Sequence, residues 1–208
     1  MIKIGFVGGP DTGKTDLARI LANILNRMGY RAQEVIEYFQ TYKRRYKEDE
    51  PIDLLDEVMV YQGQVRRDND FPDHDFVVCD TVSFLSHVHA LARGADQAKP
   101  RERYVIETLR RWGLEQVQSY AYVFHLTQTP SSRNPKGPGL SQESKNLLQK
   151  KIDAFLVCEG INCIPIRSRR TDERIEVILQ QLAKDVPGFA SRLRRFKARS
   201  WTRREGDY

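Results

Sequence analysis

The sequence has few cysteines and shows no pattern of zinc ligands. Its three cysteines, Cys79, Cys158 and Cys163, are too few for a disulfide framework and lack zinc-ligand spacing. Cys79 lies in an apolar run, so we expect buried, reduced thiols, which favour a cytoplasmic protein. His87 and His89 are two residues apart in a predicted helix and point to different faces, so no zinc site is expected.

The sequence also lacks a long hydrophobic run. No apolar stretch reaches the roughly 18 residues that cross a bilayer, so no membrane span is expected. The first residues lead directly into a predicted strand, which argues against a signal peptide. The 208 residues, 40% of them hydrophobic, suffice for one domain with or without an appendage.

Positive charge is concentrated at the C-terminus. Between Gly188 and Tyr208 there are seven basic and two acidic residues, so this segment carries +5 of the net charge of +6. We therefore divide the chain into a domain, residues 1–186, and a basic tail, residues 187–208. The tail could bind nucleic-acid phosphates or an anionic membrane. Because aromatic and apolar residues interleave with its arginines, it could equally pack as an amphipathic helix, or be disordered.

The most informative stretch lies near the N-terminus. It reads Gly8, Gly9, Pro10, Asp11, Thr12, Gly13, Lys14, Thr15 and fits the pattern G-x-x-x-x-G-K-[ST] without a mismatch. A β-rich run, residues 2–7, precedes it, and a helical periodicity, residues 16–28, follows. Backbone N–H groups of such a loop converge on phosphates at a helix N-terminus. We expect Lys14 to reach the terminal phosphates of a triphosphate and the Thr15 hydroxyl to ligate Mg²⁺.

The rest of the chain alternates strands with helices. Further strands are predicted at 31–38, 76–79, 120–126 and 162–166, and further helices at 51–68, 83–92, 101–119, 141–159 and 172–184. Residues 39–50 are aromatic and charged and are assigned to no element. This alternation predicts an α/β fold with a five-stranded, mostly parallel sheet and helices on both faces. The strands' carboxyl ends would then meet at one crevice.

Two carboxylates follow predicted strands at this crevice. Asp80 ends an apolar strand and could hold Mg²⁺ beside Thr15, orient an acceptor, or simply cap the next helix. Glu37 ends the second strand and is our candidate for the base that takes an acceptor's proton. A solvated glutamate is the equally plausible alternative. Tyr38 and Phe39 beside it could stack on a ring or serve only in packing.

Several cations and one amide complete the set of candidates. Residues 127–141 are rich in proline and glycine and read as a lid loop, in which Arg133 and Lys136 could approach a transferred phosphate. Arg167 leaves the last strand and could touch the nucleotide, or be surface charge. Gln62 and Arg66 share a helix face and could read an acceptor, although an ordinary polar face is the simpler interpretation.

These residues resemble the P-loop kinase group that includes nicotinamide riboside, deoxynucleoside and nucleoside monophosphate kinases. The resemblance covers residues 1–184 and implies a three-layer P-loop NTPase fold. It implies ATP and Mg²⁺ as cofactors, Glu37 as acceptor-side base and Gln62 as substrate contact. Asp16 after Lys14-Thr15, and a lid with one clear arginine, depart from the group's pattern.

The resemblance leaves the acceptor open. The first expectation is a kinase for a small nucleoside- or nucleotide-like acceptor. A kinase for a modified base or hydroxyl within DNA would suit the basic tail. A nucleotide-switched ATPase that regulates a nucleic-acid or protein partner is the third alternative. The sequence does not indicate an oligomeric state.

Overall fold

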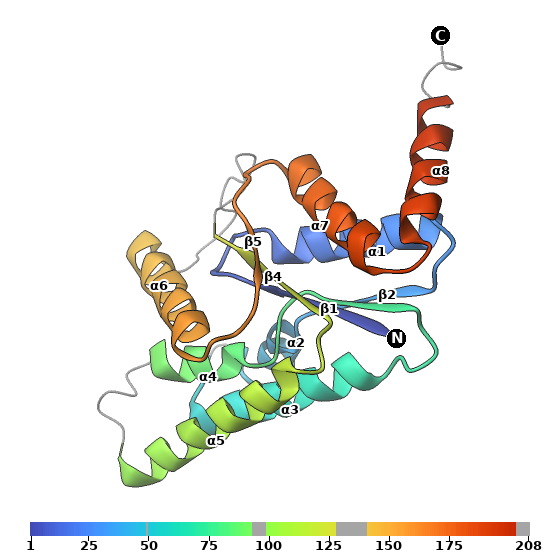
Figure 1. Cartoon of the computed structure of the whole chain (residues 1–208). Helices are drawn as coiled ribbons and strands as arrows, with labels where there is room; N and C mark the ends of the chain where they lie inside the picture. The colour runs from blue at the N-terminus through green and yellow to red at the C-terminus, as the bar shows by residue number, and fades with distance from the viewer. Residues whose placement is uncertain (49, 93–98, 128–140, 203–208) are drawn as a thin grey trace.

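The computed structural model contains one five-stranded sheet flanked by helices (Figure 1). It describes residues 1–48, 50–92, 99–127 and 141–202. The strands are β1 (Ile2–Val7), β2 (Ala32–Val35), β3 (Phe76–Cys79), β4 (Tyr122–Leu126) and β5 (Ile164–Ile166). The helices are α1 (Lys14–Arg27), α2 (Tyr38–Tyr46), α3 (Leu54–Asn69), α4 (Leu85–Ala92), α5 (Pro100–Val117), α6 (Gln142–Cys158), α7 (Thr171–Asp185) and α8 (Phe189–Thr202).

All four strand pairings are parallel, in the order β2-β3-β1-β4-β5. The central strand β1 pairs Ile4 with Val78 of β3 and with Tyr122 of β4. Because every strand runs the same way, all carboxyl ends lie at one edge of the sheet. The loops that follow β1, β2 and β3 meet there, which is where ligands bind in open α/β sheets.

Two apolar cores make the molecule three layers thick. On one face, α1, α7 and α8 cover the sheet around Phe6, Phe76 and Phe124. On the other face, α4, α5 and α6 pack on Val77 and Val123. α3 packs beside α4 and α5 through a third, smaller cluster. The predicted α/β fold, with its five-stranded parallel sheet and helices on both faces, is confirmed.

Several element boundaries differ from the expected ones. β2 ends at Val35 rather than at 38, and α4 begins at Leu85 rather than at 83. Residues 39–46, which carried no assignment, form α2 together with Tyr38, and Tyr42 is buried. α3 begins at Leu54 rather than Pro51, because Asp53 caps it: the Asp53 carboxylate accepts from the backbone N–H of Asp56, whose side chain accepts from that of Asp53. The expected cap of α6 is present, since the Ser141 hydroxyl accepts from the N–H of Ser144 at 3.1 Å.

The first part of the basic C-terminal segment is a packed helix. Phe189 is fully buried and Leu193 nearly so, both against the core that α1 and α7 form. The Phe189 ring stacks on Tyr30, with centroids 5.6 Å apart, and the Arg192 guanidinium lies 4.3 Å from the Tyr30 centroid. Tyr30 precedes β2, so α8 is anchored at the amino end of the sheet, opposite the edge where the strands end (Figure 1).

Candidate functional site

The loop between β1 and α1 is shaped by two glycines. Gly13 adopts φ 86°, a left-handed conformation that side chains disfavour, and directly precedes α1. A Cβ on Gly8 would lie 2.5 Å from the carbonyl oxygen of Leu126. The Thr12 hydroxyl donates to the carbonyl of Gly9 at 2.8 Å and closes the turn. The sequence thus folds here into a tight cradle at a helix N-terminus, a geometry that binds anions.

Two cations, Lys14 within the loop and Arg174 of α7, donate hydrogen bonds to backbone carbonyls of this loop. The Lys14 ammonium donates to the carbonyls of Gly8 and Gly9, at 2.9 and 3.0 Å, so it lies across the loop. Arg174 of α7 is 1% exposed and donates to the carbonyl of Thr12 at 2.6 Å. The supporting role of Arg174 was not predicted, because its partner lies 162 positions away in the sequence.

Asp80 and Thr15 form the oxygen pair expected of a magnesium site. The Thr15 hydroxyl donates to Oδ2 of Asp80 at 2.8 Å. Oδ1 of Asp80 is buried and has no hydrogen-bond partner among the described residues. Mg²⁺ prefers hard oxygen ligands and is commonly held by one or two carboxylates together with phosphates and water. A buried carboxylate oxygen with no partner, beside a hydroxyl and the phosphate cradle, fits that ion.

Two carboxylates near the cradle have perturbed acidities. Burial raises the pKa of Asp80, while the hydrogen bond from Thr15 and the ammonium of Lys14 act in the opposite direction. Burial also raises the pKa of Glu37, which the Lys14 ammonium lowers and the Asp80 charge raises. A carboxylate with a raised pKa is a better proton acceptor near neutral pH than an ordinary one. The direction of this shift is compatible with the predicted role of Glu37 as a base, which stays a prediction.

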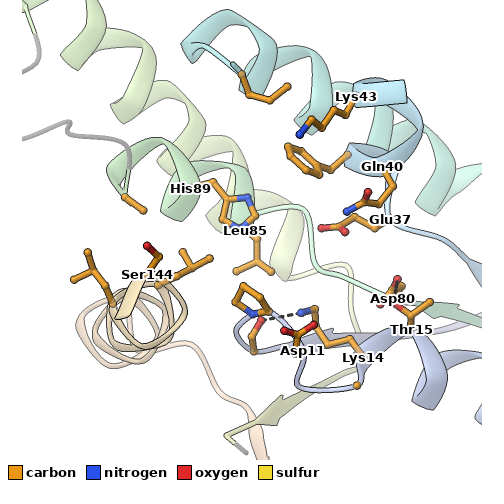
Figure 2. Close-up of a pocket in the computed structure, with 18 of the residues that line it drawn as sticks. Asp11, Lys14, Thr15, Glu37, Gln40, Lys43, Asp80, Leu85, His89 and Ser144 are labelled. Atoms are coloured by element: carbon orange, nitrogen blue, oxygen red, sulfur yellow. Dashed lines mark hydrogen bonds between the residues drawn. The ribbon is translucent and has the colours of Figure 1, made fainter. Parts of the chain in front are cut away.

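One cavity of about 840 Å³ joins these groups (Figure 2). Its floor is the phosphate cradle, including Lys14 and Thr15, and its walls come from α2, α4 and α6. Glu37 and Asp80 line it between these walls. Six of the eight predicted cradle residues face it, namely Gly8, Pro10, Asp11, Gly13, Lys14 and Thr15, whereas Gly9 and Thr12 do not line it.

Helix α6 is tied to the cradle by two polar contacts. The Lys145 ammonium lies 2.7 Å from Oδ2 of Asp11, and Oε1 of Gln149 accepts from the backbone N–H of Gly9 at 2.6 Å. The amide nitrogen of Gln149 lies 2.7 Å from the carboxylate of Asp153. These contacts hold the third wall of the cavity against the loop, and none of them was expected from the sequence.

The other predicted site residues fall outside the described cavity. Arg133 and Lys136, the expected lid cations, lie outside the residues that the structure describes. Arg167 is exposed and does not line the cavity. Gln62 and Arg66 are also exposed and line no described pocket.

Gln64, two residues after Gln62, is the buried amide of this helix. It is 2% exposed and lines a small recess together with Glu37 and Phe39. Its Oε1 accepts from the backbone N–H of Tyr38 at 2.7 Å, and its amide donates to Asp68 at 2.8 Å. Gln64 therefore fixes the first turn of α2, whose N-cap is Glu37. Gln62 was singled out because it shares a helix face with Arg66 and because the resemblance implies a glutamine on this helix.

The described residues contain neither a metal-binding cluster of side chains nor a helix that could span a membrane. Within residues 1–48, 50–92, 99–127 and 141–202, no group of three or more His, Cys, Asp or Glu side chains is arranged to hold a metal. Across the same residues, every helix is too short or too polar to pass through a bilayer.

Comparison with one solved structure supports the fold. A deoxyadenosine kinase from M. mycoides, solved with dCMP and a flexible dCDP, superposes with a TM-score of 0.58 at 14% identity, covering 88% of this chain and 100% of that one. An APS kinase variant from Mycobacterium tuberculosis aligns with a TM-score of 0.36 at 13% identity, covering 74% and 96%. A search of curated proteins found no significant match.

A family model settles the relationship that the cradle suggests. The model described as an AAA domain matches residues 3–174, from β1 to the arginine that braces the cradle. The match therefore spans the phosphate loop, both carboxylates and every strand of the sheet. The chain belongs to the AAA domain family of P-loop proteins.

Proposed function

We propose that this protein is an ATP- and Mg²⁺-dependent kinase that transfers the γ-phosphoryl group to a hydroxyl of a nucleoside- or nucleotide-like acceptor. The observation that carries the proposal is the shape of the cavity. It extends from the phosphate cradle past Asp80 to Glu37 and the wall formed by α2 and α4. A nucleotide in the cradle and an acceptor beside Glu37 would share one enclosure.

The residues present supply the parts of a phosphoryl transfer. The acceptor hydroxyl gives its proton to the Glu37 carboxylate as its oxygen bonds to the γ-phosphorus. The bond from that phosphorus to the β–γ bridging oxygen breaks, and ADP leaves. Lys14 would compensate charge on the phosphates, and Thr15 and Asp80 would hold Mg²⁺, which supplies charge neutralisation when bound.

The expected lid arginine remains part of the proposal. Phosphoryl transfer gains from a further cation near the γ-phosphate, and the predicted Arg133 lies in the segment between β4 and α6. Arg167 is less suited to this role, because it is exposed and does not line the cavity. We retain it only as a nucleotide contact to be tested.

A nucleotide-switched ATPase is the rival from another functional class. A switch needs the cradle and the metal, and it has no use for a buried carboxylate facing a second compartment. Here burial raises the pKa of Glu37, and the cavity continues beyond it between Phe39 and His89. These features favour an acceptor other than water.

The test is a screen with labelled ATP over nucleosides, nucleoside monophosphates and DNA with and without hydroxymethylated bases. Lys14→Ala should lose turnover by orders of magnitude while keeping its fold. Glu37→Gln should bind ATP as the wild type does and transfer phosphate much more slowly. Release of ADP without any phosphorylated product, at a rate that Glu37→Gln leaves unchanged, would favour the switch and contradict the kinase.

A further inference from the structure

The cavity has a second cation, at the end away from the phosphate cradle. Lys43 of α2 lines it together with Phe39 and Gln40 of the same helix. Figure 2 shows Lys43 and Lys14 at opposite ends of the cavity, with Glu37 and His89 between them. The proposed base thus lies between two ammonium groups, and only one of these belongs to the phosphate cradle.

Lys43 differs in its contacts from the other cations of this segment. No ion pair or side-chain hydrogen bond of Lys43 occurs among the described residues, whereas neighbouring cations of this segment have partners. Lys47 pairs with Glu50 and Asp56, at 3.2 and 3.5 Å. Arg44 donates to the carbonyl of Gln40, and Arg45 lies over the Tyr46 ring. A lysine that lines a cavity and has no hydrogen-bond or ion-pair partner in the described part of the chain is suited to an anionic ligand.

Helical geometry fixes how Lys43 faces the acceptor space. Residues 39, 40 and 43 are spaced i, i+1 and i+4, so they share the helix face that borders the cavity. Lys43 follows Glu37 by six residues, a rise of about 9 Å along the axis. A molecule of nucleotide size could therefore present a hydroxyl to Glu37 and an anionic group to Lys43.

The wall between the two ends suits a flat ring. The rings of Phe39 and His89 meet edge to face, with centroids 6.3 Å apart, and Leu85 lies beside them. Aromatic and apolar side chains bind a base or similar ring, and they give no attraction for a negative charge. At the end of the cavity away from the cradle, the lining cation is Lys43, whereas the lining carboxylate Glu50 pairs with Lys47 at 3.2 Å.

Resting on the proposed kinase activity, we propose that the acceptor carries a phosphate ester of its own and that Lys43 binds it. The acceptor would then be a nucleotide rather than a nucleoside. The phosphate could belong to a free nucleoside monophosphate or to a nucleotide within an oligonucleotide. The chemistry at Lys43 is the same for both, so the two sources are distinguished by experiment.

The experiment compares pairs of acceptors that differ only in a phosphate. Nucleosides, their 5′-monophosphates and short oligonucleotides are titrated by calorimetry into the full chain, with and without ADP and Mg²⁺, and kcat/KM is measured for each acceptor that turns over. Lys43→Gln is the test variant. Arg44→Gln is the matched control, because it removes the same charge from the next residue, which does not line the cavity.

We expect the wild type to bind a monophosphate more tightly than its nucleoside. Lys43→Gln should reduce that preference on the order of ten- to a hundredfold, the usual worth of a hydrogen bond to a charged group. Lys43→Gln should change nucleoside binding and ATP binding by no more than about twofold, because an exposed charge has little effect on groups that it does not contact. Arg44→Gln should change none of these values.

The outcomes separate this proposal from the kinase proposal. Equal or tighter binding of the nucleosides, or a preference that Lys43→Gln leaves intact, would overturn the role of Lys43. Preference for the oligonucleotide or for the free monophosphate would each support it and would name the source of the phosphate. Failure of the wild type to bind ATP would instead overturn the kinase proposal. The titrations of nucleosides and monophosphates without ADP would still test Lys43, because they do not depend on nucleotide binding in the cradle.

Discussion

Glu37 determines how the proposed reaction should depend on pH. Burial raises its pKa, so the acidic limb of kcat/KM should lie above about 4.3, the ordinary glutamate value. The sign follows because a base works only when deprotonated, so the rate falls as the pH drops through the raised pKa. A pH profile of phosphate transfer measures the limb, and Glu37→Gln should remove it.

A limb that persists unchanged in Glu37→Gln would contradict this assignment. It would then belong to Asp80, whose pKa burial also raises. The two carboxylates influence each other, because the charge of Asp80 raises the pKa of Glu37. The limb of the wild type is therefore a property of the pair unless the variant separates them.

Asp80→Asn should weaken Mg²⁺ binding without lowering the stability of the fold. The amide oxygen can still accept from Thr15, but the buried oxygen that we assign to Mg²⁺ loses its charge. The half-saturating Mg²⁺ concentration for turnover should rise on the order of ten- to a hundredfold. Because burial raises the pKa of Asp80, its charged form costs the fold free energy at neutral pH, so the melting temperature should stay equal or rise.

A fall in the melting temperature of Asp80→Asn would show that the carboxylate supports the fold rather than a metal. Thr15→Val is the matching control. It removes the hydroxyl that donates to Asp80 and leaves the carboxylate in place. A metal site predicts that both variants need more Mg²⁺, whereas a purely structural hydrogen bond predicts that neither does.

At the scale of single residues, a site residue could be predicted only when the pattern that marks it is contiguous in the sequence. The cradle is a contiguous motif, and Asp80 directly follows an unbroken apolar strand, so both were identified. Gln64 and Arg174 were missed as site residues because their partners are distant in the sequence. A polar residue in a helix is predicted to face solvent when the sequence gives no sign of the distant group that it contacts.

Among the elements, α2 is the one whose placement the site depends on. Its Tyr38 ring packs where a side chain on Gly63 of α3 would be, and the Arg67 guanidinium lies 4.7 Å from its centroid. Gln64 holds its first backbone N–H. The sequence left this segment unassigned, because nine residues rich in tyrosine and arginine show no clear apolar face.

Gly63→Ala should test this packing. Alanine gains about 1 kcal/mol of helix propensity over glycine. Its Cβ would overlap the Tyr38 ring, and such overpacking costs about 1–3 kcal/mol. We expect a net loss of stability in urea unfolding and a fall in kcat, because displacing Tyr38 moves Glu37.

The control for Gly63→Ala is its combination with Tyr38→Ala. Removing the ring makes room for the new methyl group, so the double variant should be more stable than the sum of the two single effects. Simple additivity of the unfolding free energies would show that Gly63 and Tyr38 do not compete for space. The placement of α2 would then have another cause.

For the whole molecule, the position of α8 changes how the basic segment can be tested. The sequence left packing, binding and disorder open for residues 187–208, and the structure buries Phe189 of this segment in the main core. Truncation before α8 would remove that side chain, and loss of a buried phenylalanine typically costs about 3–5 kcal/mol. Loss of activity on truncation would therefore say nothing about nucleic acid.

Substituting exposed arginines avoids this difficulty. Arg194 and Arg195 are exposed, and α8 is anchored at the amino end of the sheet, away from the cavity. The double variant Arg194→Gln with Arg195→Gln should keep the wild-type melting temperature, because exposed charges contribute little to stability. Turnover of a small acceptor should also be unchanged.

A DNA-binding measurement tests whether the arginines of α8 contact nucleic acid or are only surface charge. If α8 holds nucleic acid, affinity should fall steeply with salt, and each lost phosphate contact should reduce the slope of log K against log salt by about 0.9 for a duplex. A slope that the double variant leaves unchanged would show that Arg194 and Arg195 make no DNA contact.

Because α8 and the cavity lie at opposite ends of the sheet, DNA bound at α8 would have to extend around the molecule to reach Glu37 (Figure 1). We therefore expect the double variant to weaken retention of long DNA while leaving kcat for a short oligonucleotide unaltered.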